Sequence, residues 1–182
     1  IDPGIWNTWM DAIMRVKDGH IWMIKIHSTD PEMNLRREAE ALGVPGSRIH
    51  VTQGYNEKEH LFVKAAADIF LDTPSYNAHS SGCDVLWAGL PIVTLAGDKM
   101  ASRVAASLVA SMGCEETIVR TEGEYADLLV ALGTSSQGLR ETRECVRKGK
   151  ISSGLFDTKD WVNHQEAGIR MASDVAFSRG GG

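Results

Sequence analysis

The chain has 182 residues, of which 43% are hydrophobic and 24% are charged, and these fractions are those of an ordinary globular domain with one proper core. Its net charge of −5 and the lack of any basic run in the sequence argue against a general nucleic-acid surface. No apolar run approaches the roughly 20 residues that a membrane-spanning helix needs, so we expect neither nucleic acid nor membrane among the partners.

The first part of the chain alternates between helical and strand patterns. We predict, in chain order, a helix over residues 3–16, a strand over 20–26, a helix over 31–42, a strand over 48–52, a helix over 57–66 and a strand over 69–71. Asp2 is a good cap for the first helix, and Pro3 suits its first position. Gly43 follows the second helix, where a residue with positive φ ends many helices.

The second part of the chain continues the alternation. We predict a helix from Ser80 or Ser81 to residue 88, a strand over 91–95, a helix over 99–112, a strand over 117–119, and helices over 121–132, 135–148 and 155–177. Gly113 and Gly133 are the expected helix ends, and Glu124 follows Thr121 at the spacing of a capping box. This order predicts an α/β fold with a Rossmann-like, doubly wound parallel sheet.

The polar loop after the strand over 69–71 is the strongest candidate for a binding site. It leads into the helix that begins near Ser80 and Ser81, whose free N–H groups and dipole favour an anion such as a phosphate. His79 is placed to donate a hydrogen bond to a phosphate or sugar, and Asp84 to accept from ribose hydroxyls. An ordinary helix cap with a solvated histidine explains the same spacing equally well.

The three cysteines are odd in number and widely separated in the sequence. This spacing is that of neither a disulfide framework nor a zinc site, and it favours a reducing compartment. We expect Cys83 to be a small buried hydrophobic residue.

Three blocks of sequence resemble one known family. Residues 79–89 (HSSGCDVLWAG) are similar to the catalytic-domain signature of the protein O-GlcNAc transferases, and residues 101–107 and 151–159 are similar to two further blocks of that family. The resemblance runs in order over nearly the whole chain. It implies that residues 1–182 form the C-terminal, donor-binding lobe of a GT-B glycosyltransferase, without the N-terminal lobe and helical repeats.

The resemblance also implies a site for the donor UDP-GlcNAc. The pyrophosphate would rest on His79, Ser80 and Ser81, where serines replace the threonines of the family motif. Asp84 matches the family's ribose-binding aspartate. Because related O-fucosyltransferases lack the histidine of this motif, His79 favours a GlcNAc donor.

Further donor-binding positions follow from the same resemblance, with departures. His60 matches a histidine near the uracil and ribose, and the Tyr55 backbone matches the position that reads the uracil edge. Lys58 lies one residue after the position of a family lysine, which is occupied here by Glu57. Tyr76 replaces a small residue beside the sugar and would narrow the pocket for the N-acetyl group.

The activity implied is transfer of N-acetylglucosamine to Ser or Thr of protein acceptors, with inversion and without a metal or cofactor, releasing UDP. Fixed N–H donors would stabilise the charge of the leaving diphosphate. The family's general-base residues lie in the N-terminal lobe, so we expect no catalytic residue in this chain and no activity of the chain alone. The family setting implies a location in the nucleus and cytoplasm.

Other functions remain open at this point. A related O-fucosyltransferase or glucosyltransferase would use the same fold. The shifted Lys58, together with Val63 at a position where the family has an arginine, is compatible with a non-catalytic scaffold that binds nucleotide sugars. An NAD-binding module is disfavoured, because no Gly-x-Gly-x-x-Gly loop follows a predicted strand.

Overall fold

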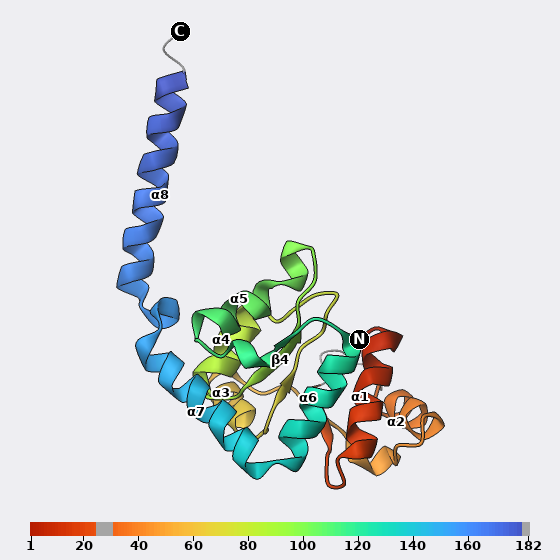
Figure 1. The fold of residues 1–182 in the computed structure, drawn as a ribbon. Coiled ribbons are helices and arrows are strands. Elements are labelled where there is room, and N and C mark those ends of the chain that lie inside the picture. Colours follow the sequence, from red (N-terminus) through yellow and green to blue (C-terminus); the bar gives the residue numbers. More distant parts are fainter. Residues whose placement is uncertain (25–30, 180–182) are drawn as a thin grey trace.

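The structure is a computed structural model that describes residues 1–24 and 31–179, with Pro31, Glu57, Lys58 and Arg179 described only as backbone. Parallel strands lie between helices, and the last helix extends away from the body (Figure 1). The α-helices are α1 (Pro3–Arg15), α2 (Pro31–Ala41), α3 (Glu57–Ala65), α4 (Ser80–Trp87), α5 (Val104–Ser111), α6 (Glu122–Thr134), α7 (Ser136–Ser152) and α8 (Thr158–Arg179).

The strands form two parallel sets within the described residues. β1 (Ile21–Ile24) pairs with β2 (Ile49–Thr52), and β3 (Phe70–Leu71), β4 (Ile92–Leu95) and β5 (Ile118–Val119) form the other set with β4 in the middle. All pairings are parallel, as the alternation of strands and helices predicted. The predicted strand over 20–26 is confirmed up to Ile24, and its last two residues lie outside the described part.

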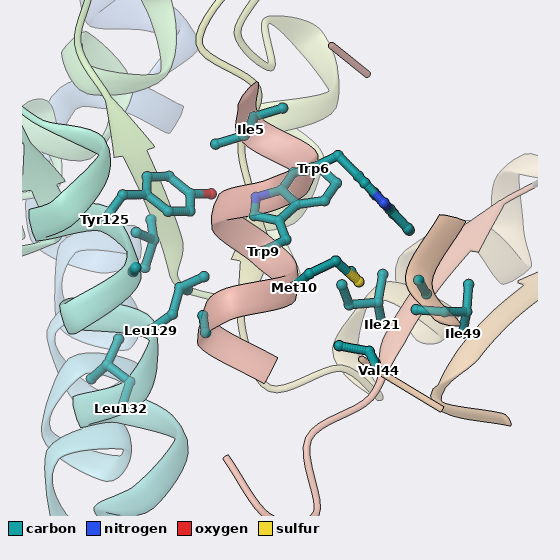
Figure 2. Close-up of a cluster of buried hydrophobic side chains, with 14 of the residues drawn as sticks. Ile5, Trp6, Trp9, Met10, Ile21, Val44, Ile49, Tyr125, Leu129 and Leu132 are labelled. Carbon is teal, nitrogen blue, oxygen red and sulfur yellow. The ribbon is translucent and has the colours of Figure 1, made fainter. Parts of the chain in front are cut away.

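The core consists of two clusters of buried side chains that share the β3–β5 sheet. In the first cluster, Ile5 and Trp9 of α1 face Tyr125 and Leu129 of α6 (Figure 2). The second cluster lies beneath α4, α5 and α7 and contains Val85, Leu86, Ile92, Val109 and Val146.

Strand β4 contributes alternate side chains to the two clusters. Val93 belongs to the first cluster and Ile92 to the second, and both are fully buried. A strand that is covered on both faces consists mostly of apolar residues. The apolar residues over 91–95 therefore predicted this strand.

Two predicted helices are divided in the structure. The helix predicted over 99–112 is a 3₁₀ turn, η2 (Met100–Ser102), followed by α5, and the backbone of Arg103 (φ −132°, ψ −2°) separates them. The turn is held by Gly97 N–H, which donates to Ser102 O at 2.7 Å. The helix predicted over 155–177 is likewise a 3₁₀ turn, η4 (Gly154–Phe156), followed by α8.

The glycines predicted to end helices have different roles. Gly43 and Gly113 have φ of +87° and +72° and end their helices, as predicted. Gly133 does not, because α6 continues to Thr134. A Cβ on Gly133 would lie 2.9 Å from Val16 Cγ2, so this glycine allows α6 to approach the end of α1 closely.

The start of α6 differs in one detail from the predicted capping box. Thr121 Oγ1 accepts from Glu124 N–H at 3.1 Å, as predicted. The Glu124 carboxylate accepts from Arg120 N–H at 2.8 Å instead of from the N–H of Thr121. The bond to Thr121 satisfies an N–H group that the helix itself leaves unpaired, and the bond to Glu124 holds the residue before the cap.

The expectation that no cysteines pair is wrong. Cys114 and Cys145 form a disulfide with Cα atoms 5.9 Å apart, and Cys83 is free and half-buried. Burial raises the pKa of the Cys83 thiol, with a smaller effect from Asp84. The disulfide joins α7 to the turn after α5, which lies 31 residues earlier in the sequence.

The same turn meets α7 at Gly149. A Cβ added at this position would collide with the carbonyl oxygen of Met112, and Gly149 is itself buried. Ser153 adds a contact from its hydroxyl to the Met112 sulfur at 3.4 Å. The absence of a side chain at Gly149 therefore lets the α7 backbone pack directly on this turn.

Replacing Gly149 by alanine is expected to lower the free energy of unfolding by about 2 kcal/mol, measured by urea denaturation. Alanine favours a helix over glycine by about 1 kcal/mol, but the new Cβ forces α7 away from Met112. The matched control is Gly168→Ala in α8, where a Cβ meets nothing within 4 Å and no loss is expected. Equal effects of the two substitutions would contradict this account.

Helix α8 carries its side chains in solvent. Every described residue of the helix is exposed, including Trp161, Ile169 and Phe177 at 62%, 60% and 80%. No helix in the described part of the chain combines the length and apolar character needed to cross a bilayer.

Candidate functional site

The candidate site lies where β3 leads through a polar loop into α4, at the carboxyl end of the parallel strand. Within the loop, Thr73 Oγ1 donates to Tyr76 O at 2.6 Å, and Asn77 donates from its side chain to Thr73 O at 2.9 Å. Asn77 N–H donates to Ala101 O at 2.8 Å and so ties the loop to η2. The loop therefore has a defined shape before any ligand binds.

Asp72 is a buried acid whose hydrogen bonds hold this loop to the core. Its carboxylate accepts from Ala78 N–H at 2.7 Å and from Thr94 Oγ1 at 2.6 Å, and its carbonyl accepts from the Tyr125 hydroxyl at 3.0 Å. Burial raises the pKa of Asp72, and the hydrogen bonds from Thr94 and Ala78 oppose this shift. Asp72 was not among the predicted site residues, although it directly follows a short apolar strand.

The first turn of α4 presents unpaired backbone donors. The helix begins at Ser80 with His79 as its N-cap, so Ser80 and Ser81 are the first two helical residues and not the cap that their type suggested. Both serines are exposed, and within the described residues their N–H groups have no hydrogen-bond partner. An anion is the natural partner for such donors at the positive end of a helix.

His79 and Tyr76 lie together beside these donors. Their rings stack with centroids 4.5 Å apart, and the Tyr76 hydroxyl is 3.3 Å from His79 Nδ1. His79 Nε2 is 3.3 Å from Ala101 O, which can only accept, so Nε2 is the donor in this contact, and in the neutral ring Nδ1 is then left to accept from the tyrosine. His79 must therefore exchange a partner before its ring can donate to a ligand.

Asp84 lies one turn further along α4 and forms an ion pair. Its Oδ2 accepts from Lys64 Nζ at 3.0 Å, and the Asp84 side chain is 50% exposed while that of Lys64 is only 9% exposed. The pair links α3 to α4. This pair could not be predicted from the sequence, because contact between two helices is not visible in the spacing of either.

The other predicted site residues lie after β2. Tyr55 is exposed in the loop between β2 and α3, and His60 is half-buried in the first turn of α3, which Asn56 caps. Lys58 also belongs to α3, but its side chain is outside the described part. No hydrogen bond among the described atoms joins Tyr55 or His60 to the residues of α4, whereas Tyr76 contacts His79 directly, and Ser80, Ser81 and Asp84 follow His79 on α4.

Potential metal-ligating groups gather at a different place. Cys114, Glu116 and Cys145 bring three ligand atoms within 4.8 Å of one another. The two sulfurs are joined in the disulfide, so they are not available as thiolates in this state.

Comparison with known proteins places most of the chain in one group. The profile of the group described as "Glycosyl transferase family 41" matches residues 1–165. A protein of Arabidopsis thaliana named "Probable UDP-N-acetylglucosamine--peptide N-acetylglucosaminyltransferase SEC" is 37% identical over 91% of this chain. A UDP-N-acetylglucosamine–peptide N-acetylglucosaminyltransferase of Caenorhabditis elegans is 33% identical, also over 91% of the chain.

A solved structure agrees with these sequence matches. A lysine-to-methionine mutant of the Thermobaculum terrenum O-GlcNAc transferase superposes on 97% of this chain with a TM-score of 0.83 and 27% identity. The chain spans 17% and 14% of the Arabidopsis and Caenorhabditis relatives and 35% of the solved chain.

Proposed function

The chain belongs to glycosyltransferase family 41, and from this premise we propose that it is the donor-binding lobe of a protein O-GlcNAc transferase. Its fold is the Rossmann-like lobe of a GT-B enzyme. The proposed donor is UDP-GlcNAc and the proposed acceptors are Ser or Thr hydroxyls of proteins. Residues 1–182 would work with an N-terminal catalytic lobe and helical repeats of the same protein, in the nucleus and cytoplasm.

The observation that carries this proposal is the start of α4. Ser80 and Ser81 offer two N–H groups that no described residue pairs, and Asp84 offers a carboxylate on the same helix face, one turn away. A nucleoside diphosphate has matching chemistry, because it combines an anionic diphosphate with neighbouring ribose hydroxyls. The arrangement supports phosphate binding by backbone donors, with His79 as an additional donor after it leaves Ala101 O.

The proposed chemistry follows from the same geometry. When the bond between sugar and diphosphate breaks, negative charge grows on the leaving UDP. Donors that are already fixed at the helix start stabilise that charge without reorganisation. We propose inversion at the sugar and transfer without a metal ion, with the general base supplied by the other lobe.

Calorimetric titration with UDP, UMP and GDP, without added metal, tests the donor site. We expect UDP to bind at least about tenfold more tightly than UMP, because the helix start contacts the second phosphate. His79→Ala and Asp84→Ala should each weaken UDP binding by about tenfold. His164→Ala is the matched control, because His164 lies exposed on α8 and its loss should leave binding unchanged.

Two results would contradict the proposal. One is equal affinity for UDP and UMP, and the other is tighter binding of GDP than of UDP. The donor sugar is tested separately in a protein that carries the flanking parts of the catalytic domain, with UDP-GlcNAc, UDP-glucose and GDP-fucose offered together with a protein acceptor. Preferred transfer from UDP-glucose or GDP-fucose would show that the donor sugar is glucose or fucose and not GlcNAc.

A further inference from the structure

We propose that Lys64 is a positioning residue of the nucleotide site, which orients the Asp84 carboxylate toward the ribose and offsets its charge beside the diphosphate. This inference rests on the proposed function, because it assumes that α4 binds a nucleoside diphosphate. It assigns a role to a residue outside the loop and helix start that form the site itself.

The Lys64 side chain lies almost entirely away from solvent. In the other ion pairs of the described residues, every side chain is at least 35% exposed, whereas Lys64 is 9% exposed. Removing an ammonium group from water is costly unless a partner of opposite charge compensates it. Asp84 is that partner, so the position of each charge depends on the other.

The two oxygens of the Asp84 carboxylate have different surroundings. Oδ2 accepts from Lys64 Nζ, and Oδ1 has no hydrogen-bond partner among the described atoms. The side chain is half exposed, so Oδ1 is available to a ligand. An ion pair that fixes one oxygen restricts the rotation of the side chain. The other oxygen is therefore held in one direction, toward the proposed position of the ribose.

Lys64 also affects the electrostatics of the proposed site. Asp84 is four residues after Ser80 and three after Ser81, which places its carboxylate on the helix face that the anion would approach. A carboxylate there repels a diphosphate. The Lys64 ammonium, 3.0 Å from Oδ2, offsets that charge while leaving the carboxylate able to accept hydrogen bonds from hydroxyl groups.

The test compares UDP with 2′,3′-dideoxy-UDP, which lacks the ribose hydroxyls, as calorimetric ligands of the full 182-residue chain. In the wild type, the hydroxyls should tighten binding by about tenfold. In Lys64→Met, this ratio of affinities should fall to about twofold, and UDP itself should bind more weakly. Lys64→Arg should restore most of the ratio, because it returns a positive charge to the position.

A merely structural lysine would weaken both ligands equally and leave their ratio unchanged. Asp84→Asn should lower the ratio, and adding Lys64→Met to it should cause no further change. The control is Lys150→Met, which removes the lysine that donates to Trp87 O at the other end of α4. That variant should keep the wild-type ratio.

The outcomes separate this inference from the proposed function. If the wild type binds UDP better than UMP but Lys64→Met keeps the tenfold ratio, the role of Lys64 is wrong and the nucleotide site stands. If the wild type shows no preference for UDP, the proposed function fails and the inference fails with it. If Lys150→Met lowers the ratio as much as Lys64→Met, the effect is general to α4 and the inference is also overturned.

Discussion

Replacing Asp72 by alanine is expected to lower the free energy of unfolding by about 3 kcal/mol, measured by urea denaturation. The carboxylate is the acceptor for Ala78 N–H and for the Thr94 hydroxyl, and Asp72 and Thr94 are both buried. Alanine would leave both donors without a partner, and the loop that leads to α4 would lose its anchor. We therefore also expect UDP binding to be lost.

Asp72→Asn is the control that keeps an acceptor for Ala78 N–H. Because burial raises the pKa of Asp72 above its usual 3.8, the folded state binds more protons than the unfolded state between 3.8 and the raised value. The pH-dependent part of the contribution of Asp72 to stability is therefore fully present below pH 3.8 and is lost as the pH rises through that window, while the hydrogen bonds from Ala78 and Thr94 to the carboxylate remain. Asn does not titrate, so Asp72→Asn should gain stability relative to the wild type as the pH rises.

The comparison of these two variants can contradict the account of the loop. If Asp72→Ala is no less stable than Asp72→Asn at neutral pH, the two donors do not depend on the carboxylate. If the difference between wild type and Asp72→Asn does not change with pH, burial does not raise the pKa of Asp72.

Loss of the disulfide is expected to lower the free energy of unfolding by about 3–4 kcal/mol, because Cys114 and Cys145 close a loop with a sequence separation of 31. Urea denaturation of Cys145→Ser without reductant measures this loss. Without the bond, α7 would keep its packing at Gly149 and Lys150 but lose its covalent link to the turn after α5.

A dithiol reductant supplies the internal comparison. It should lower the stability of the wild type to that of Cys145→Ser and should leave the variant unchanged. Cys83→Ser, which alters the free cysteine, should respond to the reductant as the wild type does. If the reductant does not change the stability of the wild type, the disulfide contributes nothing to the free energy of unfolding.

The local elements of the fold could be predicted because short-range patterns determine them. The apolar spacing over 3–16 predicted α1, and Asp2 caps it through a bond from Ile5 N–H at 3.1 Å. The residue type of Thr121 predicted correctly that it caps α6. The resemblance to a known family placed His79 and Asp84 at one helix start, and the structure gathers them there with Tyr76.

What could not be predicted depends on contacts between distant segments. Gly133 looks like a helix end in the sequence, but the neighbouring Val16 of another segment decides its role. The break at Arg103 follows η2, whose Ala101 carbonyl is bound by Asn77 and His79. The disulfide and the Lys64–Asp84 pair likewise need the packing of α7 and α3, which no spacing in the chain reveals.

The position of β4 between the two core clusters has a consequence for cooperativity. Since Val93 and Ile92 are adjacent in the strand but belong to different clusters, displacement of β4 removes packing from both clusters at once. The body of the domain should therefore melt in one transition, as small single domains usually do. Helix α8 has no buried residue in the described part and stands outside that cooperative unit, so its local opening and closing leave the body and the candidate site intact.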